Sequence, residues 1–124
     1  MRSHHDSCET TTVEPLGFLD VTEEVSSVLS RSGIRDGHVT VFSPDAECAL
    51  LLNERESGLW QDLRDCLARM QSDEVCDRRA VLGSSSVVMP AVDGRLHLGT
   101  WQRLLLVELG RPARRSLDVQ IVGE

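Results

Sequence analysis

The sequence predicts an α+β fold in which a mixed or antiparallel sheet carries helices on one face. Two observations support this: two segments have apolar residues at helical spacing, and the other apolar segments are short and separated by Gly or Pro. The 124 residues form a single domain, 1–124, whose polar first residues, 1–9, are expected to be disordered. Two helices cannot cover both faces of such a sheet, so one face should meet water or another subunit.

The first predicted elements are an edge strand over Thr10–Val13 and a strand end within Phe18–Glu24 that leads into a helix. Asp20 is the expected N-cap of this helix, with Thr22 as the alternative. Gly33 is expected to end it, because Gly tolerates the left-handed backbone of a helix C-terminus. The apolar stripe of the helix consists of Val21, Val25, Val28 and Leu29.

Two strands and a second helix are expected next. His38–Phe42 alternates like a half-buried strand, and Cys48–Leu52 is a continuous apolar run typical of a buried strand. The second helix is expected to begin at Glu56 or Ser57. Its apolar stripe consists of Leu59, Leu63, Cys66, Leu67 and Met70.

The C-terminal part is predicted to consist of consecutive strands. Val87–Met89 is expected to form a strand that Pro90 closes. The Asp93-Gly94 pair predicts a hairpin turn, because Gly adopts positive φ at little cost. A long strand is expected over Trp101–Leu109, and alternation of apolar residues predicts another over Leu117–Ile121.

Composition argues against two classes of partner. The formal net charge of −7 disfavours binding to a nucleic-acid backbone, which requires a basic surface. No apolar run approaches the roughly 20 residues of a membrane span, and Met1–Asp6 lacks the apolar segment of a secretory signal. We therefore expect a cytoplasmic protein that binds neither nucleic acid nor membranes. The cysteines contain no Cys-x-x-Cys pair, which disfavours a disulfide framework: Cys8, Cys48, Cys66 and Cys76.

General motifs give only weak indications of a site. His97 lies between two leucines on a predicted strand, so its side chain is expected on the opposite, polar face. Asp45 and Glu47 stand two residues apart after Pro44, a spacing that allows cation binding, although a solvated strand end is the simpler interpretation. Gly83–Ser86 has neither the glycine spacing nor the Lys of a phosphate-binding loop.

The segment DGRLHLGTWQRLLLVEL, with GFLDVTEEV, SGIRDGHVTVF, LLNERESGLWQDL and RRSLDVQIVGE, resembles the YjbQ-like family, which is named for a secondary thiamine-phosphate synthase activity. The match runs in order from about Phe18 to Glu124, and Val92–Glu108 is its most specific part. The resemblance implies a homotrimer that associates through its sheets. It also implies a site between subunits that is built around histidines and binds a metal and a small phosphorylated molecule.

The chain departs from the family pattern at that site. Asp45 stands where the family has His after Phe-Ser-Pro, and Ala46 and Glu47 replace two Thr. Cys76 stands where the family has a second His, seven residues before Gly83. Asp45 would repel a phosphate, because two unit charges about 5 Å apart cost on the order of 3 kcal/mol at an effective dielectric constant of ~20.

Other family positions are retained, and an arginine-rich turn adds a possible anion clamp. The retained residues are Asn53, Glu54, Thr100 and Gln102, and the arginines are Arg111, Arg114 and Arg115.

Two hypotheses about function follow from these retained and substituted residues. The chain is a trimer with weak or lost thiamine-phosphate-synthase-like activity, or it is a non-catalytic scaffold or ligand-binding trimer. In the second case Asp45 and Cys76, with His97, are candidate ligands for a divalent metal such as zinc, in storage or sensing. Whether the chain is an enzyme stays open.

Overall fold

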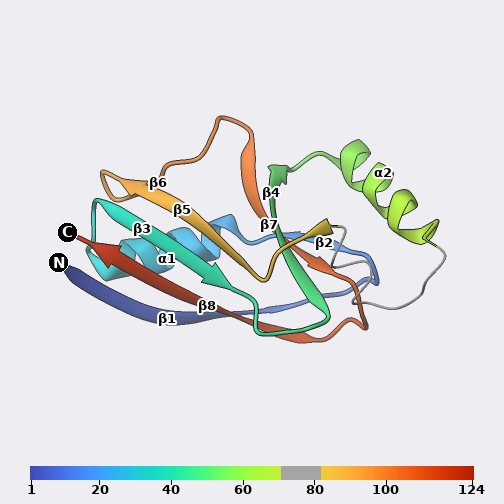
Figure 1. Ribbon diagram of the computed structural model, residues 1–124, viewed down its shortest axis with the longest axis horizontal. Helices are drawn as coiled ribbons and strands as arrows, with labels where there is room; N and C mark the ends of the chain where they lie inside the picture. Colours follow the sequence, from blue (N-terminus) through green and yellow to red (C-terminus); the bar gives the residue numbers. More distant parts are fainter. Residues whose placement is uncertain (71–81) are drawn as a thin grey trace.

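The computed structural model describes residues 1–70 and 82–124 (Figure 1). Cys76 lies outside the described residues. Strands dominate the described chain, and the two helices α1 and α2 interrupt them. The elements are β1 (Arg2–Thr11), β2 (Phe18–Asp20), α1 (Thr22–Ser32), β3 (Gly37–Phe42), β4 (Cys48–Glu54), α2 (Ser57–Ala68), β5 (Ser86–Val92), β6 (Arg95–Leu96), β7 (Gln102–Glu108) and β8 (Arg114–Gly123).

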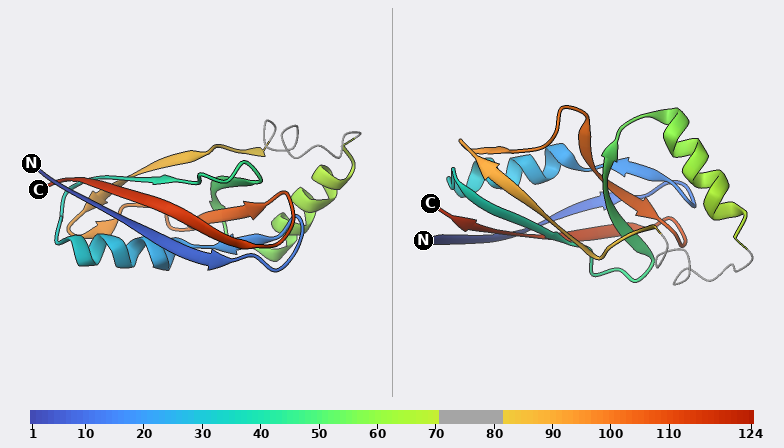
Figure 2. Two further views of the ribbon diagram at one scale, coloured as in Figure 1. Left: turned by 90° about the horizontal axis from the view of Figure 1, so that it is seen from below. Right: turned by 45° about the horizontal axis from the view of Figure 1, so that its top comes forward.

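The strands form two sheets, and every pairing among the described strands is antiparallel. A curled five-stranded sheet has the order β1-β8-β3-β5-β6, and a three-stranded sheet has the order β2-β7-β4. The predicted α+β class is confirmed, but the single sheet with both helices on one face is wrong. Helix α1 packs against the inner face of the five-stranded sheet, whereas α2 lies against the three-stranded sheet (Figure 2).

Strand β7 lies between two apolar clusters, which explains its continuous run of apolar residues. Leu104 and Leu106 face α1 and the five-stranded sheet, whereas Leu105 and Val107 join the cluster beneath α2. All four side chains are fully buried. A strand that is covered on both faces shows no alternation of apolar and polar residues, so this run marks the centre of the fold.

The expected disorder of residues 1–9 is wrong, because Arg2–Thr11 pairs with β8 along its whole length. The Arg2 guanidinium also donates to the carbonyl oxygens of Ser32 (2.9 Å) and Gly33 (3.3 Å) at the C-terminus of α1. The ammonium group of Met1 lies 2.5 Å from a carboxylate oxygen of Glu124. Backbone pairing and ion pairs therefore order a segment whose side chains show no apolar pattern.

Both predicted helices are confirmed, but the N-cap of α1 differs from the expectation, and α2 ends at Ala68, before Met70 of its predicted stripe. Val21 occupies the N-cap position of α1 without a side-chain bond, and Asp20 instead accepts from the backbone and hydroxyl of Thr22. Gly33 ends α1 at φ 73°, as predicted. Glu56 caps α2 by accepting from two backbone amides. Only Leu67 of the α2 stripe is fully buried, and Cys66 is exposed.

Strand β5 continues past Pro90, contrary to the expectation that this residue closes the strand. Pro90 has no amide N–H to donate, but it lies beside the short edge strand β6, where its carbonyl accepts from the backbone amide of His97 (2.8 Å). Asp93 and Gly94 then adopt φ angles of 53° and 78°, the left-handed pair of a two-residue hairpin. The predicted Asp-Gly turn is confirmed.

The outer face of the five-stranded sheet carries no helix of the described chain (Figure 2). Phe42, Val88 and Val92 lie on this face and are 43%, 59% and 43% exposed. Exposed apolar side chains that share one sheet face are typical of an association surface. Among the described residues, neither helix is long and apolar enough to cross a membrane.

Candidate functional site

Asp45, which stands where the family resemblance implies a histidine, lies in a cluster of three carboxylates around one arginine. Asp45 and Glu47 belong to the connection between β3 and β4, Glu108 ends β7, and Arg115 is the second residue of β8. Cys48 at the start of β4 pairs with Glu108, so the β3–β4 connection returns to the end of β7. We refer to Asp45, Glu47, Glu108 and Arg115 as the Arg115 cluster.

Arg115 uses its whole guanidinium on groups of this chain. Its Nε and Nη2 donate to the two carboxylate oxygens of Glu108 at 2.9 and 2.8 Å. Its Nη1 donates to Asp45 (3.0 Å), and Nη2 also reaches Glu47 (3.2 Å) and the carbonyl oxygen of Arg111 (2.9 Å). Arg115 is buried and Glu108 is fully buried. The cluster is therefore a buried bidentate pair with two partly exposed acids added to it.

The electrostatics of the cluster stabilise its charged groups. The hydrogen bonds that Arg115 donates to Glu108 raise the pKa of Arg115, and hydrogen bonds from the Arg111 amide and the Arg115 side chain lower the pKa of Glu47. Burial, reinforced by the negative charge of Glu108, raises the pKa of the Cys48 thiol to about 12. Three carboxylates against one guanidinium leave a formal charge of −2, which repels a phosphate.

The arginine-rich turn is not arranged as an open anion clamp. Arg115 is enclosed by carboxylates of the chain itself, and Arg114 forms an ion pair with Glu9. Arg111 is exposed, and its backbone amide donates to Glu47 (3.2 Å). Of the three predicted anion-binding side chains, two are thus engaged by acids of the chain.

The retained family residues lie at the other end of the three-stranded sheet. Glu54 is paired with Gln102 at the end of β4, whereas Cys48, beside the Arg115 cluster, is paired with Glu108 at its start. A strand of seven residues spans about 20 Å, so Asn53 and its neighbours cannot contact Asp45 within one chain. The structure does not bring the two halves of the predicted site together in one subunit.

The Gly-Thr-Trp-Gln segment forms a tight turn with a structural explanation. The backbone amide of Gln102 donates to the carbonyl oxygen of Gly99 (3.0 Å), and the Gln102 side chain accepts from the Gly99 amide (2.8 Å). Thr100 and Trp101 stand exposed at the tip of this turn, and Trp101 is 73% exposed. The Gln side chain thus closes the turn that precedes the buried strand β7.

The predicted metal ligands do not converge among the described residues. His97 follows β6, beside Pro90, and Pro90 pairs with His38 near the start of β3. Asp45 follows the end of β3, so His97 and Asp45 lie at opposite ends of this strand. Within residues 1–70 and 82–124, no three His, Cys, Asp or Glu side chains are grouped so as to hold a metal ion.

Sequence reasoning missed Glu108, the central acid of the cluster. A usable signal existed, because this glutamate directly ends the apolar run of β7, and a glutamate in a buried position requires a partner. Thr12 was also missed: its hydroxyl donates to Glu108, and its own amide donates to the Ala113 carbonyl (3.0 Å). The cluster therefore also fixes the chain that follows β1.

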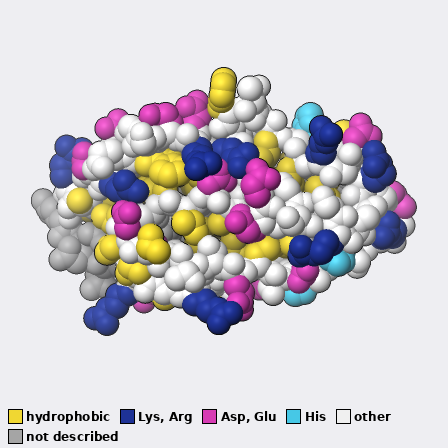
Figure 3. All heavy atoms as spheres, turned by 180° about the vertical axis from the view of Figure 1, so that it is seen from behind, with side chains coloured by type: hydrophobic (Ala, Val, Ile, Leu, Met, Phe, Trp, Pro, Cys, Tyr) yellow, Lys and Arg dark blue, Asp and Glu magenta, His cyan; other side chains and the backbone are white. Residues whose placement is uncertain are grey.

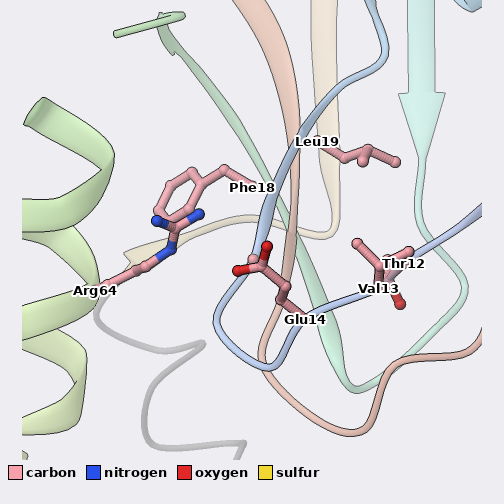
Figure 4. Close-up of a pocket in the computed structure, with 7 residues that line it drawn as sticks. Thr12, Val13, Glu14, Phe18, Leu19 and Arg64 are labelled. Atoms are coloured by element: carbon pink, nitrogen blue, oxygen red, sulfur yellow. The ribbon is translucent and has the colours of Figure 1, made fainter. Parts of the chain in front are cut away.

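A small cavity lies beside Phe18 and Arg64, between the chain that follows β1 and helix α2 (Figure 4). Arg64 extends over the Phe18 ring, with its guanidinium carbon 5.7 Å from the ring centre, and its Nε donates to the Leu16 carbonyl (3.0 Å). The cavity volume of about 40 Å³ suits a few water molecules and is too small for a metabolite. We therefore assign it no ligand.

Comparison with known proteins identifies the family. Residues 6–124 match the family described as UPF0047 protein YjbQ-like. A UPF0047 protein of Methanothermobacter thermautotrophicus is 34% identical over 119 residues, which cover 86% of this chain and 83% of the relative. A YbjQ-like protein of unknown function from Sulfolobus solfataricus has a TM-score of 0.91 at 27% identity and 99% coverage of both chains. A hypothetical protein of Aeropyrum pernix has a TM-score of 0.86 at 31% identity, over 98% of this chain and 99% of that chain. The chain belongs to the YjbQ-like UPF0047 family.

Proposed function

We propose that this chain is a self-associating YjbQ-like protein in which thiamine-phosphate-synthase-like activity is weak or lost. The observation that carries the proposal is the bonding of Asp45 to Arg115 at a position where the family has His. A histidine there can bind a metal or carry a proton near neutral pH. Asp45 places a negative charge at this position instead, and one of its carboxylate oxygens accepts from Arg115 (3.0 Å).

The local charge supports the same conclusion. The carboxylates of Asp45 and Glu47 are 34% and 48% exposed, so an incoming ligand meets the two acids before it meets the buried arginine. Each unit charge about 5 Å from a phosphate opposes its binding by about 3 kcal/mol at an effective dielectric constant of ~20. A phosphorylated substrate is therefore a poor ligand for this end of the molecule.

Self-association is supported by the uncovered outer face of the five-stranded sheet. The exposed side chains of Phe42, Val88 and Val92 form an apolar patch on this face. Contact with a second copy of the chain would bury this patch away from water. The proposed assembly is a homotrimer, as the family resemblance implies. Light scattering of the purified protein tests it, and a stable monomer would contradict the proposal.

Complementation of a strain that requires thiamine tests the loss of activity. We expect no growth from soluble, trimeric wild-type protein, and a thiamine-phosphate formation assay in vitro should show little or no product. The double variant Asp45→His/Cys76→His, which restores both family residues, is the matched comparison. Growth supported by the wild-type protein at the level of an active family member would overturn the proposal.

Metal analysis of untagged protein separates this proposal from a metal-binding function. We expect negligible zinc or other divalent metal, because Arg115 already holds the carboxylate of Asp45. Stoichiometric metal that disappears in both Asp45→Ala and Cys76→Ala would instead assign the chain to metal binding.

A further inference from the structure

A trough runs along helix α1, between the helix and the chain from Asp93 to Arg103, and the proposed function does not use it. It consists of two adjoining hollows of about 350 and 390 Å³. Both hollows are lined by Leu29, Ser30 and Arg95, so they form one continuous depression. Each volume falls in the range of small-molecule sites in proteins. Figure 3 views the molecule from the side of α1, where basic and acidic side chains lie side by side.

The trough has an apolar floor and a polar rim. Leu29 is buried, and Leu96 and Leu98 are half-buried members of the main core. The polar residues Ser30 and Thr100 line the same depression. A floor of leucine side chains with a few hydrogen-bonding groups above it is typical of a site for a small organic molecule.

The charges along the trough are paired with one exception. Arg103 donates to Asp20 (2.7 Å) and to Glu23 (2.9 Å), and Arg35 lies 3.6 Å from Asp93. Arg95 forms no ion pair or hydrogen bond through its guanidinium within residues 1–70 and 82–124. Its positive charge is therefore available to a ligand, in contrast to that of Arg115.

The walls of the trough are held in place by short hydrogen-bonded turns. Arg95 follows the Asp93-Gly94 turn directly and is paired with Val92, and the Gly94 amide donates to the Arg35 carbonyl (2.8 Å). At the other end, the Gln102 side chain closes the turn that carries Thr100. Turns that are fixed before binding lower the entropy lost when a ligand is bound.

We propose that the trough binds small organic anions, with Arg95 holding a phosphate or carboxylate group above the leucine floor. A guanidinium binds either group through two parallel hydrogen bonds. The floor requires an apolar body next to the anionic group, so inorganic phosphate alone should bind weakly. Thr100 and Gln102, two of the retained family positions, line the trough, but the inference uses none of the residues of the Arg115 cluster on which the proposed function rests.

Titration followed by amide resonances in NMR spectra tests the proposal on the full-length protein. The probes are phenyl phosphate, benzoate and, as a neutral control, benzyl alcohol. We expect saturable shifts at Ser26, Ser30 and Thr100 with at least one of the two anions, and none with the alcohol. The response to phenyl phosphate and to benzoate shows which anionic group the site accepts.

Three variants identify the role of Arg95. Arg95→Gln should weaken binding of the anion by about tenfold, and Arg95→Lys should fall between this variant and the wild type. The matched control is Arg31→Gln, because Arg31 lies on α1, the helix that borders the trough, but is paired with Asp6 and does not line the trough. Unchanged amide positions in the two sheets would show that the variants fold normally.

The proposal is overturned if neither anion gives saturable shifts at these residues, which includes the case in which a neighbouring copy fills the trough. It is also overturned if Arg95→Gln binds as tightly as the wild type, or if benzyl alcohol binds as tightly as the anions. None of these outcomes affects the complementation result, so the trough proposal and the proposed function are tested separately.

Discussion

The guanidinium of Arg115 donates two parallel hydrogen bonds of 2.9 and 2.8 Å to the carboxylate of Glu108, and the glutamate has no exposed surface. The pair connects the end of β7 to the start of β8, and Thr12 and Asp45 extend it to two further segments. It therefore occupies the place where the family resemblance implies a binding site, and it stabilises the fold at that place. Four testable consequences concern stability and local order.

Glu108→Gln should lower the free energy of unfolding by about 3 kcal/mol, because the buried arginine loses its bidentate partner. Urea unfolding measures the change. Glu14→Gln is the control, since Glu14 is exposed and its carboxylate has no partner within residues 1–70 and 82–124; its effect should stay within about 0.5 kcal/mol. Equal effects of the two substitutions would contradict the stabilising role of the pair.

Stability should fall on acidification partly through Asp20. Burial raises the pKa of this aspartate, but hydrogen bonds from Arg103 and Thr22 outweigh burial and hold the pKa below its ordinary value of 3.8. A carboxyl with a depressed pKa in the folded state contributes stability above its unfolded pKa, and that contribution is lost as the pH falls through the folded pKa. Unfolding free energies measured from about pH 6 down to about pH 3 should decline.

The variant Asp20→Asn isolates this contribution. It should be less stable than the wild type near pH 6, and the difference should shrink as the pH approaches about 3. Asp62→Asn, on the exposed side of α2, is the control and should follow the wild-type curve. A difference between Asp20→Asn and wild type that stays constant with pH would show that Asp20 acts only through packing.

Two glycine substitutions should lower the free energy of unfolding by different amounts for a geometric reason. A Cβ on Gly123 would lie 2.0 Å from the Asp36 carbonyl oxygen, where strands β3 and β8 approach closely. Gly123→Ala should therefore cost more than about 2 kcal/mol. A Cβ on Gly94 would lie 3.7 Å from Nη1 of Arg35, an ordinary van der Waals contact, so Gly94→Ala meets only the strain of its positive φ and should lower the free energy of unfolding by about 1 kcal/mol. Urea unfolding measures the loss of stability in both variants. A larger loss for Gly94→Ala than for Gly123→Ala would be inconsistent with this register of β3 and β8.

Helix α2 should open independently of the main core. Trp60 stacks on Phe18 with ring centres 5.6 Å apart, and its indole N–H donates to the Glu54 carbonyl (3.0 Å). Trp60→Leu removes both contacts and should speed amide exchange in α2 by about tenfold, with little change in α1. Trp101→Leu is the control, because Trp101 is exposed, and it should leave exchange in both helices unchanged. Equal acceleration in α1 and α2 would show that the helices open together.

Local patterns predicted the elements that short-range physics determines. The apolar spacing from Val25 to Leu29 identified α1, and Gly33 ended it because only its immediate backbone geometry matters there. The Asp93-Gly94 turn was predicted for the same reason. Only the end of β1, Thr10 and Thr11, fell within the predicted edge strand; the rest of β1 was missed because its order comes from pairing with β8, more than a hundred residues away in the sequence.

The candidate site was predicted only in part. The resemblance to the family identified Asp45 as a substituted position, but nothing next to Asp45 in the sequence indicates that Arg115, 70 residues later, binds it. The arginine-rich turn suggested anion binding because charge can be counted locally, whereas the carboxylates that neutralise it come from distant strands. Glu108 showed a signal only in retrospect, as a charged residue in an otherwise buried strand.

The sequence by itself determined the α+β class, the presence of both helices, the end of α1 at Gly33, the hairpin turn and the family resemblance, since each depends on residues close together along the chain. The tertiary structure decided the two-sheet arrangement, the order of β1, the closure of the Arg115 cluster and the available charge of Arg95. These depend on which distant groups satisfy one another's charges and hydrogen bonds, as when Thr12 meets Glu108 across 96 residues, and only the folded chain fixes those partners.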